Sequence, residues 1–241
     1  MEAKMLRTIG WYTNFAITLA MKIPQSYKVK SLLKSGKITE ADAYIHKTTS
    51  KWAMSQVKMS GAKVSLFGEE NIPSNIPVLF VSNHQSNFDI ALFMSYINMP
   101  KGYISKIEMK KIPVLSTWMG FMRCVFMDRG NLRKAAESIS EGIKILKSGY
   151  SMVLFPEGTR SKGDHMNEFK AGAFKLATKS GVPIIPVTIK GSYKLMEANN
   201  NKIRPAEVEI HVHPMVQTAT LTREEQGELP DFIKAIIQSK L

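Results

Sequence analysis

The stretch that decides the fold is Pro77-Val78-Leu79-Phe80-Val81-Ser82-Asn83-His84-Gln85-Ser86-Asn87-Phe88-Asp89. Its apolar start predicts a buried strand over residues 78–82, and the apolar run that follows predicts a helix over residues 90–97. The polar residues between them then form a loop at the carboxyl end of the strand. Because ligands of open α/β sheets bind in the crevice beyond these strand ends, the loop is a candidate site.

Two titratable side chains lie in this loop, His84 and Asp89. A histidine accepts or releases a proton near neutral pH, and a carboxylate in the first turn of the next helix can curl back to meet it. Such a carboxylate fixes the imidazole tautomer and leaves the other ring nitrogen free as a general base. The alternative is that Asp89 only favours the helix N-terminus and that His84 is a hydrogen-bonded loop residue.

The chain beyond residue 61 alternates strand-like and helical patterns. Strands are predicted at residues 63–67, 78–82, 102–105, 124–127, 152–155, 184–189 and 208–212, and helices at residues 90–97, 132–147, 169–179 and 223–238. Strands that alternate with helices indicate a mostly parallel sheet flanked by helices. The predicted fold class is therefore α/β, with residues 62–241 as one domain.

A second polar cluster directly follows the strand predicted at residues 152–155, and it reads Phe155-Pro156-Glu157-Gly158-Thr159-Arg160. In a parallel sheet it opens on the same edge as the His84 loop. Arg160 offers a planar fork of donors that suits a phosphate, and Gly158 lets the backbone approach a ligand closely. Glu157 is expected to orient Arg160 or to accept from a substrate hydroxyl. The alternative is a turn closed by a Glu157–Arg160 ion pair.

Other polar residues carry less information. Lys106 and Arg129 each follow a predicted strand and are candidate cations of the same site. His211 and His213 alternate on one strand, but no carboxylate or thiolate close in sequence completes a metal site, so a structural role is predicted. The single cysteine, Cys124, excludes an internal disulfide and a cysteine-based metal cluster. No metal site is predicted.

Charge is the unusual feature of the composition. The 241 residues include 33 Lys and Arg against 20 Asp and Glu, a net charge of +13, whereas the 44% hydrophobic content is ordinary for a globular protein. Such an excess of cations indicates an anionic partner: nucleic acid, a membrane surface or a phosphorylated substrate. The excess is concentrated near the N-terminus, where residues 1–63 hold 11 of the basic and three of the acidic residues.

Residues 5–23 are apolar nearly all round and predict a helix that needs lipid or a deep interior. Its uncharged part, between Arg7 and Lys22, reaches only ~21 Å of the ~30 Å hydrocarbon core. Pro24 is expected to end this helix, and a polar, lysine-rich connector follows. A second predicted helix, ending near residue 61, interleaves aromatic side chains with lysines, which suits the headgroup region of a bilayer.

Residues 1–61 are thus predicted to form a two-helix element that dips into one leaflet of a membrane. The alternative is that these helices pack on the chain's own α/β domain. The same mixture of aromatic residues and lysines would suit RNA, but no recognition-module signature accompanies it, so no nucleic-acid partner is expected.

The His84–Asp89 spacing is an H-x4-D motif. Together with Phe-Pro-Glu-Gly-Thr-Arg at residues 155–160, it resembles the glycerolipid acyltransferase family, specifically the 1-acyl-sn-glycerol-3-phosphate acyltransferases. Two softer family blocks occur in the same order, at residues 106–130 and 182–187. The resemblance covers roughly residues 77–190, most of the predicted α/β domain.

This resemblance implies acyl transfer from acyl carrier protein or acyl-coenzyme A to the free 2-hydroxyl of a lysophosphatidic acid, without metal or bound cofactor. His84 would take the hydroxyl proton while Asp89 holds the ring, and Asn83 or a loop backbone amide would stabilise the oxyanion. The substrate-binding residues that it implies are Lys106, Arg129 and Arg160 for the phosphate, and Glu157, Gly158 and Thr159 for the acceptor pocket.

Members of this family are commonly associated with membranes. This agrees with the basic, aromatic N-terminal element and predicts a peripheral or monotopic protein on the anionic lipid surface at the cytoplasmic face of the cell membrane. Two other interpretations stay open. One is a member of the family with another acceptor, such as glycerol 3-phosphate or a lyso-aminolipid. The other is a non-enzymatic basic protein that binds a membrane surface or RNA.

Overall fold

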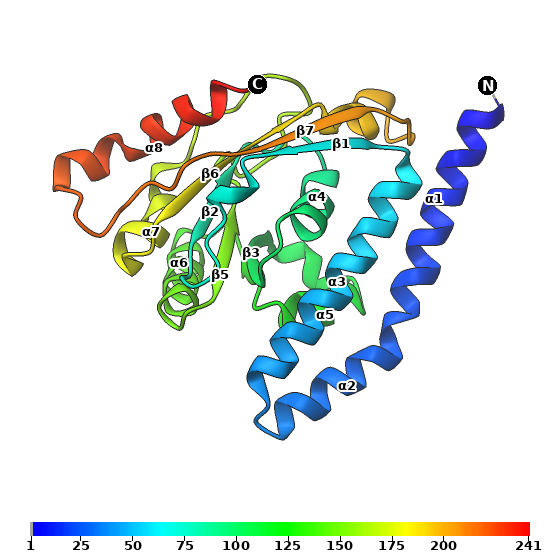
Figure 1. Cartoon of the computed structure of the whole chain (residues 1–241), viewed down its shortest axis with the longest axis horizontal. Helices are drawn as coiled ribbons and strands as arrows, with labels where there is room; N and C mark the ends of the chain where they lie inside the picture. Colours follow the sequence, from blue (N-terminus) through cyan, green and yellow to red (C-terminus); the bar gives the residue numbers. More distant parts are fainter. Residues whose placement is uncertain (1) are drawn as a thin grey trace.

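The computed structural model describes residues 2–241, with side chains from Met5 onward, and contains a seven-stranded sheet of order β1-β7-β6-β2-β5-β3-β4. The strands are β1 (Lys63–Phe67), β2 (Leu79–Ser82), β3 (Lys101–Lys106), β4 (Val125–Met127), β5 (Ser151–Leu154), β6 (Ile184–Lys190) and β7 (Glu207–Val212). Neighbouring strands are parallel except β6 and β7. The predicted mostly parallel sheet is therefore confirmed (Figure 1).

Helices cover both faces of the sheet. They are α1 (Glu2–Ala20), α2 (Lys22–Lys34), α3 (Ile38–Ser60), α4 (Phe88–Tyr96), α5 (Leu115–Phe121), α6 (Leu132–Lys147), α7 (Lys175–Ser180) and α8 (Arg223–Gln238), with short 3-10 turns that include η2 (Ile107–Lys111), η4 (Ser192–Leu195) and η5 (Glu197–Asn199). Alternate residues of β2 point to opposite layers: Phe80 packs with α3 and α4, and Leu79 and Val81 pack with α6, α7 and α8. Burial on both faces explains why this strand reads as a continuous apolar run.

The N-terminal element contains one helix more than predicted. Since α2 begins at Lys22, Pro24 lies in the first helical turn, where a backbone N–H has no partner within the helix and the fixed φ of proline is tolerated. Pro24 therefore does not end helical structure, and the lysine-rich connector is itself a helix. Val29 and Leu32 of this segment are buried and pack α2 on the rest of the protein. The many lysines of the segment made it read as a polar connector in the sequence.

The inner faces of the N-terminal helices pack on the rest of the chain. The Trp11 indole donates to the Gln56 carbonyl at 3.0 Å, and its ring lies 5.3 Å from that of Phe88 at the start of α4. One hydrophobic cluster thus runs from α1 through α3 to the sheet, as the packing alternative expected. The division of the chain into an N-terminal element of residues 1–61 and a domain of residues 62–241 stays a prediction. Within residues 2–241, no helix combines the length and the apolar character that crossing a membrane requires.

We predict that Trp11→Ala lowers the free energy of unfolding by about 3–5 kcal/mol, because it leaves a cavity between α1, α3 and α4. Urea denaturation followed by circular dichroism measures the change. The control is Ile9→Ala on the outer face of α1, where the side chain is 57% exposed and the expected change is within about 0.5 kcal/mol. Equal midpoints for Trp11→Ala and the wild type would show that α1 does not pack as described.

Candidate active site

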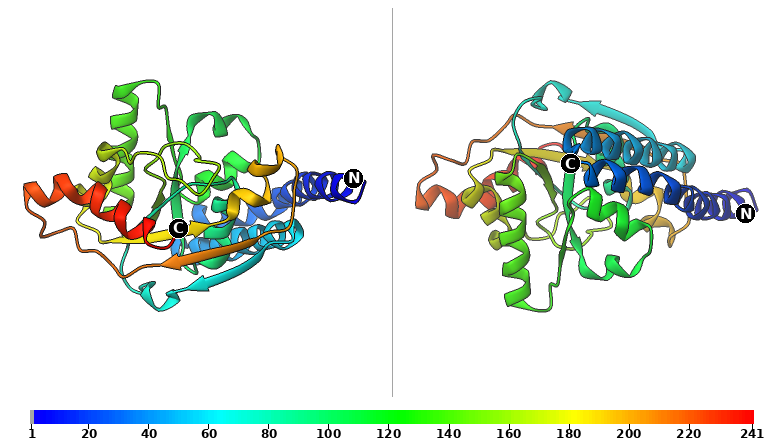
Figure 2. Two further views of the ribbon diagram at one scale, coloured as in Figure 1. Left: turned by 90° about the horizontal axis from the view of Figure 1, so that it is seen from above. Right: turned by 90° about the horizontal axis from the view of Figure 1, so that it is seen from below.

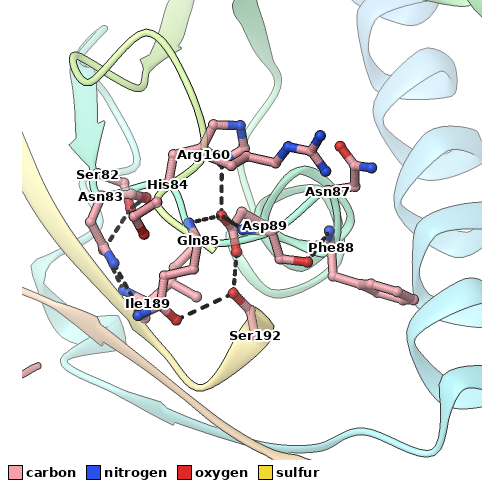
Figure 3. Close-up of polar contacts among 12 residues, drawn as sticks. Ser82, Asn83, His84, Gln85, Asn87, Phe88, Asp89, Arg160, Ile189 and Ser192 are labelled. Atoms are coloured by element: carbon pink, nitrogen blue, oxygen red, sulfur yellow. Dashed lines mark hydrogen bonds and ion pairs between the residues drawn. The ribbon is translucent and has the colours of Figure 1, made fainter. Parts of the chain in front are cut away.

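The two polar loops open on the same edge of the sheet. They follow β2 and β5, which are parallel neighbours, so their carboxyl ends lie side by side. The backbone joins them directly, since the Ser161 N–H donates to the His84 carbonyl at 2.7 Å. The residues predicted to form one site, His84, Asp89 and Arg160, are therefore brought together (Figure 3).

Asp89 is fully buried and organises the first loop. Its Oδ2 accepts from the His84 ring at Nδ1 (2.8 Å) and from the backbone N–H groups of Gln85 (2.7 Å) and Ser86 (2.8 Å), while Oδ1 accepts from the Ser192 hydroxyl at 2.5 Å (Figure 3). An ionised carboxylate only accepts, so Nδ1 of the imidazole carries a proton and Nε2 is left as the basic atom. The curl-back geometry expected for the pair is present.

The His84 ring is fixed in orientation by its neighbours and is partly exposed to solvent. It stacks on the Phe155 ring, with centroids 4.3 Å apart and planes at 23°. The His84 side chain remains 17% exposed, and within residues 2–241 its Nε2 has no hydrogen-bond partner. A ring with a fixed tautomer and a reachable second nitrogen meets the geometric requirement of a general base.

Glu157 joins the two loops through its buried side chain. Its buried carboxylate accepts from the His84 N–H at 2.6 Å and from the Asn167 N–H at 2.8 Å. Burial raises the pKa of Glu157, and the hydrogen bonds from these two N–H groups oppose that rise. Glu157 was expected to orient Arg160 or to contact the acceptor. Instead, both of its carboxylate oxygens accept hydrogen bonds that hold the His84 loop to the second loop.

Arg160 has a partner that the sequence did not indicate. Its Nη1 lies 2.7 Å from Oε1 of Glu197, a residue of η5 whose side chain is only 2% exposed, so the proposed internal pair with Glu157 does not form. No motif or spacing marks Glu197, which is brought to the site only by the tertiary fold. Ser192, the other residue missed, lies two residues after the end of β6, and the strand-end argument used for His84 could have found it.

The remaining predicted site residues are Gly158 and Thr159 of the second loop and the cations Arg129 and Lys106. The guanidinium of Arg129 donates to the Gly158 carbonyl, and Gly158 has a φ of 71°, a left-handed conformation that favours glycine. Thr159 is exposed at the tip of the turn. The Lys106 ammonium pairs with Glu108 of η2 at 2.9 Å. Arg129 thus reaches the loop, whereas Lys106 is turned toward η2.

The Asn83 side chain has a structural role and does not face the position of a bound thioester. Its side-chain amide donates to the Ile189 carbonyl and accepts from the Ile189 N–H, both at 2.8 Å, and the residue is fully buried. One N–H of its side-chain NH₂ group is therefore engaged, and full burial keeps this amide away from a bound thioester. This reciprocal pair ties the first loop to the end of β6 (Figure 3). Of the two candidate donors to the oxyanion, Asn83 and a loop backbone amide, the backbone amide remains.

His211, His213 and Cys124 have structural roles away from the two loops. His211 contacts Glu209 and His213 contacts Thr188, each at 2.8 Å. Cys124 is buried, which raises the pKa of its thiol to about 12. In the part of the chain that the structure describes, no group of three or more His, Cys, Asp and Glu side chains is placed to hold a metal ion.

Comparison with known proteins identifies the family to which this fold and this base–carboxylate pair belong. The family described as Acyltransferase matches residues 63–190, more than half of the chain. The chain therefore belongs to the acyltransferase family and is an acyltransferase.

Named relatives refine this assignment. The chain is 32% identical over 183 residues to a 1-acyl-sn-glycerol-3-phosphate acyltransferase of Borreliella burgdorferi, covering 76% of this chain and 73% of that protein. A probable enzyme of the same name from Mycoplasma pneumoniae is 37% identical, covering 63% of this chain and 58% of the relative. The crystal structure of the 1-acyl-sn-glycerophosphate (LPA) acyltransferase PlsC from Thermotoga maritima superposes with a TM-score of 0.84 at 25% identity, covering 99% of this chain and 95% of that chain.

We predict that Glu157→Gln lowers the free energy of unfolding by about 1–3 kcal/mol, because the new amide NH₂ must face one of two buried backbone N–H donors. Thermal and urea denaturation measure the loss. Glu168→Gln is the matched control, since Glu168 is an exposed acid in the same loop that pairs with Lys234. Unfolding of Glu157→Gln at the wild-type midpoint would contradict the two hydrogen bonds.

Proposed function

We propose that this chain transfers an acyl group from a thioester to the free 2-hydroxyl of a 1-acyl-sn-glycerol 3-phosphate, making phosphatidic acid. The observation that carries the proposal is the His84–Asp89 pair, whose Nδ1 and Oδ2 atoms are 2.8 Å apart. The loop that carries His84 is joined to the Arg160 loop by a backbone hydrogen bond. A base and a cation on adjoining loops suit an acceptor that carries a hydroxyl close to a phosphate. The names of the relatives support this choice of acceptor.

The reaction proceeds in two proton-balanced steps. His84 Nε2 takes the proton of the 2-hydroxyl as that oxygen attacks the thioester carbonyl carbon, and Asp89 stabilises the imidazolium that forms. The tetrahedral intermediate then collapses with cleavage of the carbon–sulfur bond, and the imidazolium gives its proton to the departing thiolate. A backbone N–H of one of the two loops stabilises the oxyanion. Each step is assigned to the chain itself, and no metal or bound cofactor enters the proposal.

The acceptor phosphate is assigned to Arg160, with Arg129 as a second cation. The ion pair of Arg160 uses Nη1, so other N–H donors of its guanidinium remain for phosphate oxygens. Gly158 and Thr159 form the turn between these two side chains. Lys106 reaches the phosphate only if it leaves Glu108, and both of these side chains are exposed enough to separate easily. Acyl carrier protein and acyl-coenzyme A are both proposed donors.

The outer face of α1 and α2 is proposed to dock on an anionic membrane, at the cytoplasmic face of the cell membrane. Figure 2 shows α1 along the outside of the molecule, projecting beyond the sheet. Its inner face packs on α3, yet apolar side chains also cover the opposite face. The exposed apolar residues of α1 are Met5, Leu6, Ile9, Tyr12 and Ile17, and Met21, Ile23 and Tyr27 continue them into α2. Lysines of α2 flank this face and suit anionic headgroups.

We predict that His84→Ala lowers the rate of acyl transfer to lysophosphatidic acid by about 10²–10⁴, because it removes the base. Thiol release is measured with acyl-coenzyme A and with acylated acyl carrier protein as donors, and in separate reactions with glycerol 3-phosphate in place of lysophosphatidic acid. His165→Ala, in an exposed loop, is the control and should keep full activity. Equal turnover of His84→Ala and the wild type would remove His84 from the mechanism.

For the membrane contact, we predict that the double variant Ile9→Asp, Ile17→Asp binds vesicles of phosphatidylglycerol and phosphatidylcholine at least about ten-fold more weakly, because charged side chains replace exposed apolar ones that would insert among the lipids. Vesicle co-sedimentation measures the affinity. Transfer to a short-chain, soluble acceptor should persist, because these side chains lie outside the catalytic loops. Phe232→Asp, at an exposed position of α8, is the matched control. Unchanged vesicle binding by the double variant would place the membrane contact elsewhere.

A further inference from the structure

Glu197 is a buried acid in the irregular segment between β6 and β7. The segment carries η4 and η5 and contacts α1, since the Tyr12 hydroxyl donates to the Asn201 carbonyl at 3.2 Å. Only 2% of the Glu197 side chain is exposed. A buried carboxylate is costly unless it is hydrogen-bonded, so its contacts should reveal its role.

The contacts of Glu197 join both catalytic loops. Its Oε1 accepts from Nη1 of Arg160 at 2.7 Å and from the backbone N–H of Asn87 at 2.9 Å, and its Oε2 accepts from the Ser86 hydroxyl at 2.6 Å. Ser86 and Asn87 lie between the two residues of the His84–Asp89 pair. One oxygen atom therefore touches both the loop that carries the base and the side chain assigned to the phosphate.

We propose that Glu197 is a positioning residue that sets the separation between Arg160 and His84, and thereby makes the site selective for acceptors with a phosphate one short glycerol segment from the reacting hydroxyl. This inference rests on the proposed function. A free arginine side chain samples many rotamers, whereas an ion pair to a buried carboxylate restricts it to one direction. The anchored guanidinium keeps other N–H donors for the phosphate.

The sign of the charge distinguishes positioning from attraction. A buried anion beside a phosphate site weakens the pull on a phosphate, so Glu197 opposes binding by long-range electrostatics. Its benefit must therefore come from orientation, which a shared contact to both loops supplies. Selectivity then depends on distance, because a phosphate that lies too far from the hydroxyl cannot meet Arg160 while the hydroxyl meets His84.

The test compares lysophosphatidic acid with 1-acylglycerol, which has the same acyl chain but lacks the phosphate. Glu197→Ala is expected to raise the KM for lysophosphatidic acid by about 10- to 100-fold, the loss of an oriented charge-assisted contact, with kcat changed by less than about three-fold. The preference for lysophosphatidic acid over 1-acylglycerol should fall by the same factor. Glu197→Gln should recover most of the KM, because its amide oxygen still accepts from Arg160 and Asn87.

A double-mutant cycle with Arg160→Ala separates this role from general support of the fold. In the Arg160→Ala background, Glu197→Ala should change the KM by less than about two-fold, because its effect acts through the guanidinium. Glu197→Asp keeps the charge but is too short to span both loops, so it should show the KM rise even if the alanine variant unfolds. Glu209→Ala removes an acid paired with His211 on β7 and is the control for charge.

Three results would overturn the inference. They are an unchanged KM in Glu197→Ala and Glu197→Asp, an equal fall of kcat/KM for both acceptors, and a full Glu197 effect that persists without Arg160. Failure of the proposed function is distinguishable, because the wild type would then transfer no acyl group to lysophosphatidic acid. That outcome would contradict the activity itself and the inference with it.

Discussion

The buried carboxylate of Asp89 is the constraint on which the site depends. Removing a charge from water costs several kcal/mol, and this cost is offset only when donors surround the carboxylate. Asp89 receives four hydrogen bonds, from the His84 ring, two successive backbone N–H groups and the Ser192 hydroxyl. The loop must close around the carboxylate to supply them. The same closure fixes the proton on His84 Nδ1, so folding of the loop and preparation of the base are one event.

Two further buried carboxylates extend this arrangement to neighbouring segments. Glu157 binds the His84 N–H from the second loop, and Glu197 binds the first loop and Arg160 from the segment after β6. Segments far apart in sequence are therefore held at one sheet edge by anions that face inward. The cations of the site stand outside these anions, where an anionic acceptor can meet them. This separation fits a chain of net charge +13 that acts on phosphorylated lipid.

Much of this could be predicted because local patterns encode it. Periodicity located the seven strands and most helices, and the parallel sheet brought two loops to one edge. Pro24 misled because proline ends a helix in its interior but is accepted in its first turn. Sequence does not specify which way a loop side chain points, so Glu157 was assigned to the acceptor pocket although it faces inward. Glu197 carried no local signal, because only the path of the chain after β6 brings it to Arg160.

The most direct test of one acceptor site formed by both loops is a crystal structure with lysophosphatidic acid bound in the absence of an acyl donor, when the acceptor cannot react. The phosphate should lie on the Arg160 guanidinium, with the 2-hydroxyl oxygen about 2.6–3.2 Å from His84 Nε2. A phosphate bound away from Arg160, or a hydroxyl that cannot reach His84 while the phosphate is held, would contradict the arrangement of base and cation around one headgroup.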